Sequence, residues 1–150
     1  MIRLQSDDFD ISQEVRTLTN DRTDIGAVVT FTGLVRDFAG DEKISSMTLE
    51  HYPAMARKQL EDIDAEARRR WQLQDSLIIH RYGDLTPGDQ IVLVVTLSAH
   101  REDAFLAAQY LMDWLKTKAP FWKKEATQSG QQWVAAKADD DDAAARWIKK

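Results

Sequence analysis

The sequence predicts an α+β protein in which helices pack on a largely antiparallel or mixed sheet. Segments with apolar residues at helical spacing alternate with short β-branched runs, in the order α, β, β, α, β, β, α, β. The run at 90–98 is nearly all apolar, so we expect it to be a central strand that is covered on both faces. A chain of 150 residues has the usual size of one domain, so a single domain over 1–150 is expected.

The first elements are predicted at residues 11–18 and 26–32. Apolar residues recur at helical spacing over 11–18, after Asp10 or Ser12 as the N-cap, which predicts a short helix. The run over 26–32 is rich in β-branched and aromatic residues and predicts a strand. Gly33 is expected to end that strand.

A polar stretch and a long helix follow. The stretch 37–46 contains a Gly-Asp pair typical of a flexible loop, and the run 47–52 predicts a second strand. Pro53 suits the first turn of a helix. Apolar residues at steps of four and three over 56–71 give this helix one apolar stripe, and the arginines at 68–70 complement the carbonyl end of its dipole.

The second half of the chain continues this alternation. Strands are predicted at 76–82 and 90–98, joined by a turn over 83–89. The best amphipathic pattern covers 101–118 and predicts a third helix, which ends shortly before a proline. The run 131–136 predicts a final strand.

Composition excludes several classes of protein. Cysteine is absent, which excludes disulfides, thiolate metal sites and a cysteine nucleophile. The three histidines lack a metal-binding spacing, so we expect no metal and no cofactor. A net charge of −5 argues against a general nucleic-acid binder. Without a signal pattern or a long apolar run, the chain is expected to be cytoplasmic and to bind no membrane.

Residues 116–124 gather four lysines and no acidic residue. Because the rest of the chain is acidic, positive potential is focused here. Pro120 ends the preceding helix, so Lys116 is expected in its last turn and Lys123 on an extended segment beyond it. Two amines from different elements can then approach one anion pocket. The alternative is structural, because lysines in a last helical turn also complement the helix dipole, for ~1 kcal/mol or less.

Three further cationic residues follow predicted strands. Arg36 comes shortly after the first strand, and His100 with Arg101 stands where the central strand passes into a helix. A helix N-terminus presents free N–H groups, which favour an anion. The alternatives are an ordinary loop arginine at Arg36, a helix cap at His100 and a surface ion pair at Arg101. Together with Lys116 and Lys123, these residues suit a substrate that carries phosphate or carboxylate.

Glu50 and His51 stand at the end of a predicted strand and resemble an acid–base pair. Adjacent strand residues point to opposite faces of a sheet, so the two side chains cannot easily act together. Structural roles are therefore favoured for both.

Five runs of the sequence occur in the order and at the spacing of a known enzyme. They are residues 26–36, 49–53, 79–85, 98–101 and 115–125. Together they resemble the large, catalytic subunit of molybdopterin synthase, from about Asp24 to Trp133. The string Lys-Thr-Lys-Ala-Pro-Phe-Trp-Lys-Lys-Glu in the last run is the most specific part of the match.

The resemblance implies an α/β hammerhead-type domain with an added β subdomain. It also implies a homodimer within a heterotetramer, in which a small ubiquitin-like sulfur-carrier subunit lies at each outer end. The C-terminal Gly-Gly of that partner carries a thiocarboxylate. The implied activity is a sulfurtransferase, which converts cyclic pyranopterin monophosphate to molybdopterin in molybdenum cofactor biosynthesis.

Site residues follow from the same resemblance. Lys116 and Lys123 correspond to the catalytic lysines, and Lys137 stands where a basic residue of the tail reaches the pocket. Leu34 departs from the basic residue often found at its position, so a backbone role is expected there. The residues implied in substrate binding are Leu34, Val35, Arg36, His100, Arg101, Lys124 and Glu125.

The lack of cysteine agrees with a sulfur-carrying partner, because this chain has no thiol that could hold the sulfur itself. Two rival functions stay open at this point. One is a noncatalytic adaptor whose lysines dock an acidic tail. The other is a single-strand nucleic-acid binder that stacks bases on Phe121 and Trp122, which the acidic net charge disfavours.

Overall fold

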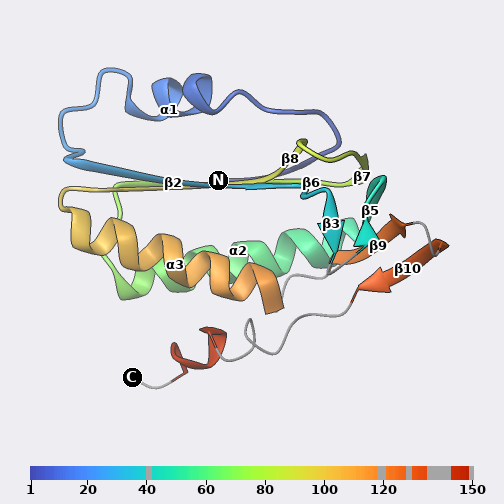
Figure 1. The fold of residues 1–150 in the computed structure, drawn as a ribbon. Coiled ribbons are helices and arrows are strands. Elements are labelled where there is room, and N and C mark those ends of the chain that lie inside the picture. The colour runs from blue at the N-terminus through green and yellow to red at the C-terminus, as the bar shows by residue number, and fades with distance from the viewer. Residues whose placement is uncertain (40–41, 118–120, 128–129, 135–142, 149–150) are drawn as a thin grey trace.

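The computed structural model describes residues 1–39, 42–117, 121–127, 130–134 and 143–148. In these ranges the chain forms two four-stranded sheets and a small two-stranded sheet, with helices packed on the first of them (Figure 1). The α+β class is therefore confirmed. The elements are β1 (Ile2–Gln5), α1 (Ile11–Thr19), β2 (Ala27–Leu34), β3 (Phe38–Ala39), β4 (Glu42–Lys43), β5 (Ser46–His51), α2 (Pro53–Arg70), β6 (Asp75–Arg81), β7 (Gly83–Leu85), β8 (Gln90–Ser98), α3 (Arg101–Thr117), β9 (Phe121–Thr127) and β10 (Gly130–Val134).

The first sheet has the strand order β1-β6-β8-β2 and is mixed. β1 runs parallel to β6, whereas β8 is antiparallel to both β6 and β2. Every residue of β8 from Val92 to Ser98 is buried, so the prediction of a central strand is confirmed. β2 lies at the edge of this sheet, with β8 as its neighbour.

Helices cover both faces of the first sheet. Figure 1 shows α1 on one face and α2 with α3 on the other. Successive strand residues point to opposite faces. Accordingly, Ile79 packs with Leu18 of α1, whereas Ile78 packs with Leu60 and Leu111 on the side of α2 and α3. Alternate residues of the apolar strand β6 thus contribute to two hydrophobic cores, one on each face of the sheet.

The helix starts follow the local signals in the sequence. The Asp10 carboxylate accepts a hydrogen bond from the backbone N–H of Gln13 at 3.1 Å, so Asp10, rather than Ser12, caps α1. Pro53 occupies the first turn of α2 as predicted. Ala56 and Leu60 of the predicted apolar stripe are fully buried.

The second sheet has the order β10-β9-β5-β7 and is antiparallel throughout. It lies at the end of the molecule where α3 finishes (Figure 1). A small core of Val35, Met47, Leu49 and Leu85 packs between this sheet and the loop after β2. This sheet corresponds to the added β subdomain, and it places β9 beside the C-terminal end of α3.

Three connections differ from the predictions. Gly33 does not end β2, because the strand continues through a register shift to Leu34, and a Cβ at Gly33 would lie 3.0 Å from Val92 Cγ1. Here glycine permits close packing rather than a strand end. The predicted turn 83–89 contains β7, and the predicted loop 37–46 contains the β3–β4 pair. Both strands depend on pairing that local sequence does not reveal.

The strands nearest the two ends of the chain also differ from the predictions. The sequence patterns did not predict β1, a four-residue strand that pairs with β6 along its whole length. At the other end, β10 stops at Val134, and residues 135–136 of the predicted final strand lie outside the described residues. None of the helices in the described ranges combines the length and apolarity that a membrane span requires.

Candidate active site around two lysines

Lys116 lies in the last turn of α3, as predicted. The apolar face of this helix holds it against the sheet through Leu111 and Leu115, which leaves Lys116 exposed at its C-terminal end. Helix α3 stops at Thr117, close to the predicted end. Lys118 and Pro120, on which that prediction depended, lie outside the described residues.

Lys123 lies on β9, an extended segment beyond the helix, also as predicted. Strand alternation places Lys123 on the same face of β9 as Phe121 and Glu125. Their partners in β5 include Leu49, opposite Lys123, and His51, opposite Phe121. Because Leu49 is buried, this is the inner face of the second sheet, and Lys123 is half-buried there.

Four rings form a column beside these lysines. The Phe121 ring stacks on His80 of β6 at a centroid distance of 3.7 Å and an interplanar angle of 11°. His51 of β5 also stacks on the Phe121 ring, at 5.6 Å and 20°. His51 in turn contacts Tyr82 at 4.4 Å. The column joins the first sheet to the second and fixes the start of β9.

His80 is uncharged at neutral pH. Burial lowers the pKa of its imidazole to about 4, against the opposing effect of a hydrogen bond to the Arg81 carbonyl. The nearby charges of His51, Lys116 and Lys123 lower it further. The charges of both lysines therefore reach the same buried ring, although they come from different elements.

Burial also lowers the pKa of the His51 imidazole. Both imidazoles of the column thus favour the neutral form. The positive charge of the site therefore comes from the lysines. Burial and nearby cations both disfavour the protonated, charged form of an imidazole.

The buried state of His80 predicts a specific loss of stability in acid. The unfolded chain binds a proton at this imidazole near pH 6.5, whereas the folded protein binds it only near pH 4. Stability from this group is therefore complete above pH 6.5 and is lost as the pH falls towards 4, by about 2 kcal/mol between pH 7 and pH 5. In urea unfolding, His80→Gln should lack this part of the decline. Equal declines in the variant and the wild type would contradict the assignment.

Glu125 and Lys124 follow Lys123 on opposite faces of β9. Glu125 is 5 % exposed on the inner face, and its Oε2 has no hydrogen-bond partner among the described residues. Lys124 points to the outer face, where its ammonium lies 5.0 Å from the ring centroid of Trp133. Glu125 is therefore on the side of the candidate site, and Lys124 is on the other side of the sheet.

Leu34, Val35 and Arg36 end β2 and begin the following loop. Leu34 is exposed, whereas Val35 is buried. The backbone of Val35 donates to the Asp89 carbonyl and accepts from Gly88. Val35 is therefore a packing residue that holds Arg36 in place. Arg36 is exposed and lines an open depression of about 670 Å³ together with Val35, Asp37, Phe38, Pro87 and Gly88.

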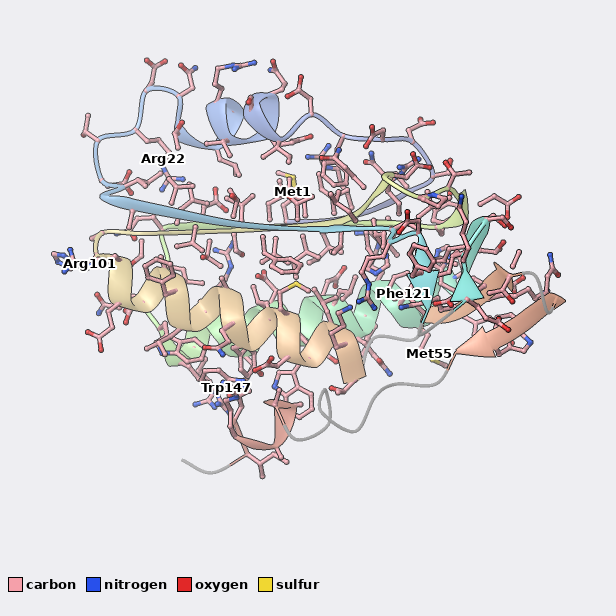
Figure 2. All side chains as sticks on the ribbon, viewed as in Figure 1. Met1, Arg22, Met55, Arg101, Phe121 and Trp147 are labelled. Carbon is pink, nitrogen blue, oxygen red and sulfur yellow. The ribbon has the colours of Figure 1, made fainter. Side chains whose placement is uncertain are left out.

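His100 and Arg101 lie at the far end of the molecule from the lysines. Both are exposed at the start of α3, and Figure 2 shows Arg101 and Phe121 at opposite ends of the protein. Arg101 and Lys116 are fifteen positions apart on one helix, a rise of about 22 Å. One copy of the chain therefore does not bring all five predicted cations together.

Sequence reasoning missed two residues of this site. His80 lies in the family run 79–85, but nothing in that run assigns it a role, because its ring partner Phe121 comes from β9. The sequence favours a structural role for His51, because adjacent strand residues such as Glu50 and His51 face opposite sides of the sheet. Glu50 is exposed and His51 is half-buried, so that alternation holds, but the face of His51 is the one that carries Phe121 and Lys123. Lys137, implied in the pocket, lies outside the described residues.

Comparison with known proteins shows the family of the chain. The family model described as MoaE protein matches residues 4–118. The chain belongs to the MoaE family. Within the family, the molybdopterin synthase catalytic subunit of Rhizobium meliloti is 54% identical over 151 residues, covering 99% of this chain and 96% of that protein. The resemblance that the sequence motifs indicated is therefore confirmed.

Solved structures of MoaE relatives have the same fold. The molybdopterin biosynthesis MoaE protein from Burkholderia ambifaria has a TM-score of 0.85 at 51% identity, covering 100% of this chain and 99% of that one. The crystal structure of molybdopterin synthase from Staphylococcus aureus has a TM-score of 0.81 at 32% identity, covering 89% and 96%. This MoaE chain thus matches its relatives over nearly their whole lengths.

Proposed function

We propose that this chain is the catalytic subunit of a molybdopterin synthase and transfers sulfur to cyclic pyranopterin monophosphate. The observation that carries the proposal is the placement of Lys116 in the last turn of α3 and of Lys123 on the inner face of the next strand, β9. These lysines come from two elements joined by a short link, at the point where the family motif is most specific. The relatives at about 50% identity are named molybdopterin synthase catalytic subunits.

The sulfur comes from a partner, because this chain contains no cysteine. In the proposed reaction, the thiocarboxylate sulfur of a small ubiquitin-like subunit bonds to a carbon of the pterin side chain. A carbon–oxygen bond of that carbon breaks, and its oxygen leaves as hydroxide or with the phosphate. Water then attacks the acyl carbon, and the carbon–sulfur bond of the partner's tail breaks. The tail leaves as an ordinary carboxylate and the sulfur stays on the pterin. A second tail repeats the transfer, so the dithiolene needs two thiocarboxylates and no oxidant.

The lysines supply the electrostatics of this reaction. An ammonium group pairs with the thiocarboxylate or the phosphate, and it stabilises the negative charge that develops as sulfur leaves the acyl carbon. Lys116 is exposed at the end of α3 and can meet the incoming tail, whereas the half-buried Lys123 faces the interior of the site. Either amine can also donate or accept a proton during the transfer.

A second copy of the chain can supply the missing cations. His100 lies beside the start of β2, where the backbone N–H of Gly26 donates to the Ser98 carbonyl, and Arg36 follows the end of the same strand. β2 is a sheet edge, and it carries the exposed apolar side chains Val28, Phe31 and Leu34. If two copies associate antiparallel along β2, the start of one strand meets the end of the other.

This geometry supports a pocket shared between two protomers. One copy would contribute Lys116, Lys123 and Arg36, and its partner would contribute His100 and Arg101. The pocket would then hold the phosphate and pterin of the substrate between two chains. The sulfur-carrier subunits would bind at the outer ends of such a homodimer. A cytoplasmic location stays a prediction.

The function is tested by incubating the purified chain with cyclic pyranopterin monophosphate and a thiocarboxylated ubiquitin-like partner. Dithiolene product should form with the partner and should not form with the pterin alone. An adaptor would bind the partner without turnover, and a nucleic-acid binder would bind neither component. Absence of product with an active partner would overturn the proposal.

A further inference from the structure

The turn between β8 and α3 carries His100 and Arg101, and its neighbours in the fold hold its backbone. Both side chains are exposed, so they have few packing contacts that could fix their position. Their placement therefore depends on the backbone of the turn. The residues on either side of the pair, Ser98 and Asp103, both form hydrogen bonds with one residue of a different loop, Gln72.

Gln72 lies between α2 and β6, and its backbone is bound from two sides. The Ser98 hydroxyl donates to the Gln72 carbonyl at 2.7 Å, and the Gln72 N–H donates to the Asp103 carboxylate at 3.0 Å. These two hydrogen bonds form the Gln72 clamp. Ser98 is 2 % exposed at the end of β8, and its hydroxyl oxygen accepts from the backbone N–H of His100 at 3.4 Å. Asp103 lies in the first turn of α3. One backbone residue thus ties the end of β8 to the start of α3.

The loop that contains Gln72 is itself anchored to the core. The Trp71 ring packs against Tyr110 of α3 at a centroid distance of 5.4 Å. The backbone N–H of Gln74 donates to the Leu97 carbonyl at 2.8 Å, which extends the pairing of β6 with β8. Because the loop is fixed on both sides of Gln72, its hydrogen bonds can fix the turn as well.

The other side of the turn lies against the start of β2. The N–H of Gly26 donates to the Ser98 carbonyl at 3.0 Å. A Cβ at Gly26 would overlap the carbonyl oxygen of Ala99, so only glycine lets the turn lie this close to the strand. β2 is the edge along which a second copy is proposed to associate. The turn is therefore held where the shared pocket needs it.

We propose that Ser98 and Asp103 are positioning residues for substrate binding, which hold the turn before α3 in the geometry that receives an anionic substrate. His100 and Arg101 are the groups that meet the substrate, and the positioning residues act on them through the Gln72 backbone. A turn that is already fixed raises affinity, because binding does not have to order it. The inference rests on the proposed shared pocket, but the clamp itself can be measured without substrate.

Two variants of Asp103 isolate the hydrogen bond. Asp103→Ala removes the acceptor of the Gln72 N–H, whereas Asp103→Asn keeps an acceptor oxygen. Both variants lack the charge, so a difference between them reports the hydrogen bond. The Kd for cyclic pyranopterin monophosphate, measured by calorimetry, should rise about tenfold in the Ala variant and stay within about threefold of wild type in the Asn variant. At saturating pterin, kcat should stay within about twofold in both.

Equal Kd values in the two Asp103 variants would overturn the inference. Glu102→Ala is the matched control, because it removes an exposed carboxylate from the same helical turn. It should change the Kd by less than about twofold. A change as large as that of Asp103→Ala would show that any acidic residue of this turn has the same effect, and would contradict the clamp.

A double-mutant cycle tests whether the two positioning residues act on the same turn. Ser98→Ala removes the hydroxyl that binds the Gln72 carbonyl, and it should also raise the Kd about tenfold. If both hydrogen bonds hold one turn, the loss of the first makes the second less effective. The double variant with Asp103→Ala should then fall well short of the hundredfold increase that independent effects would give. A full hundredfold increase would contradict a shared clamp.

Amide hydrogen exchange measures the clamp without substrate or turnover. The Gln72 N–H should be protected in the wild type and in Asp103→Asn, and should exchange at least about tenfold faster in Asp103→Ala. The Gln74 N–H should stay protected in all three. An unprotected Gln72 N–H in the wild type would overturn the inference whether or not the variants fold, and faster exchange at both amides would show general loosening of the loop and overturn it too. A wild type that binds the pterin with the expected variant pattern but makes no product would instead refute the sulfur transfer and leave the positioning role standing.

Discussion

Lys116→Ala should abolish turnover, with a loss of at least about a hundredfold in kcat. The lysine lies at the end of α3, where the partner's tail and the phosphate of the substrate need a fixed positive charge. Alanine removes that charge. The loss should appear in kcat rather than in KM, because the lost interaction is with charge that develops during the reaction.

The fold should survive this change. Lys116 is exposed, and its structural contribution is that of a cation in a last helical turn, roughly 1 kcal/mol or less. Lys123→Ala should reduce turnover severely by the same reasoning. Lys58→Ala removes an exposed lysine of α2, 3.2 Å from Asp62, and is the matched control that should keep full activity. Near-normal product formation by a folded Lys116→Ala variant would refute the catalytic assignment.

Mixing two inactive variants should restore activity if the pocket is shared. Lys116→Ala lacks the amine, and Arg101→Ala lacks the guanidinium at the opposite end of α3 (Figure 2). In a mixed dimer, one pocket combines both defects. The other pocket takes Lys116 from one chain and Arg101 from its partner, and is intact.

The size of the recovery follows from the symmetry. Equal amounts of the two chains, refolded together, give mixed dimers in half of the population, each with one intact pocket of two. The mixture should therefore reach about one quarter of the wild-type rate. A mixture of Lys116→Ala with Lys123→Ala should show no recovery, because both defects lie in the same half-site. Activity no higher than that of the separate variants would place Arg101 outside the pocket.

Much of the fold was predictable because its signals are local. The Asp10 cap, Pro53 at the start of α2 and the apolar run of β8 each specify an element through a few neighbouring residues. The strands that the sequence did not predict depend on pairing with segments distant in the chain. β1 is a strand because β6 lies beside it, and β7 is a strand because β5 pairs with it. A short polar or mixed segment carries no pattern that reveals such pairing.

The candidate site was predictable to a similar degree. The break between α3 and β9 placed Lys116 and Lys123 on different elements, and a helix break has local causes. His80 escaped notice because its burial and its ring partner arise only when the two sheets meet. The separation of Arg101 from the lysines follows from the length of α3, which the sequence did predict.

A single-turnover experiment that counts sulfur atoms tests the central claim most directly. Excess chain and thiocarboxylated partner are mixed with the pterin, and quenched samples are analysed by mass spectrometry. Because each tail delivers one sulfur and the chain has no thiol, two thiocarboxylates should be consumed per dithiolene, through a singly sulfurated pterin. Consumption of one tail per product, or product formed at a comparable rate from free sulfide without the partner, would contradict the account.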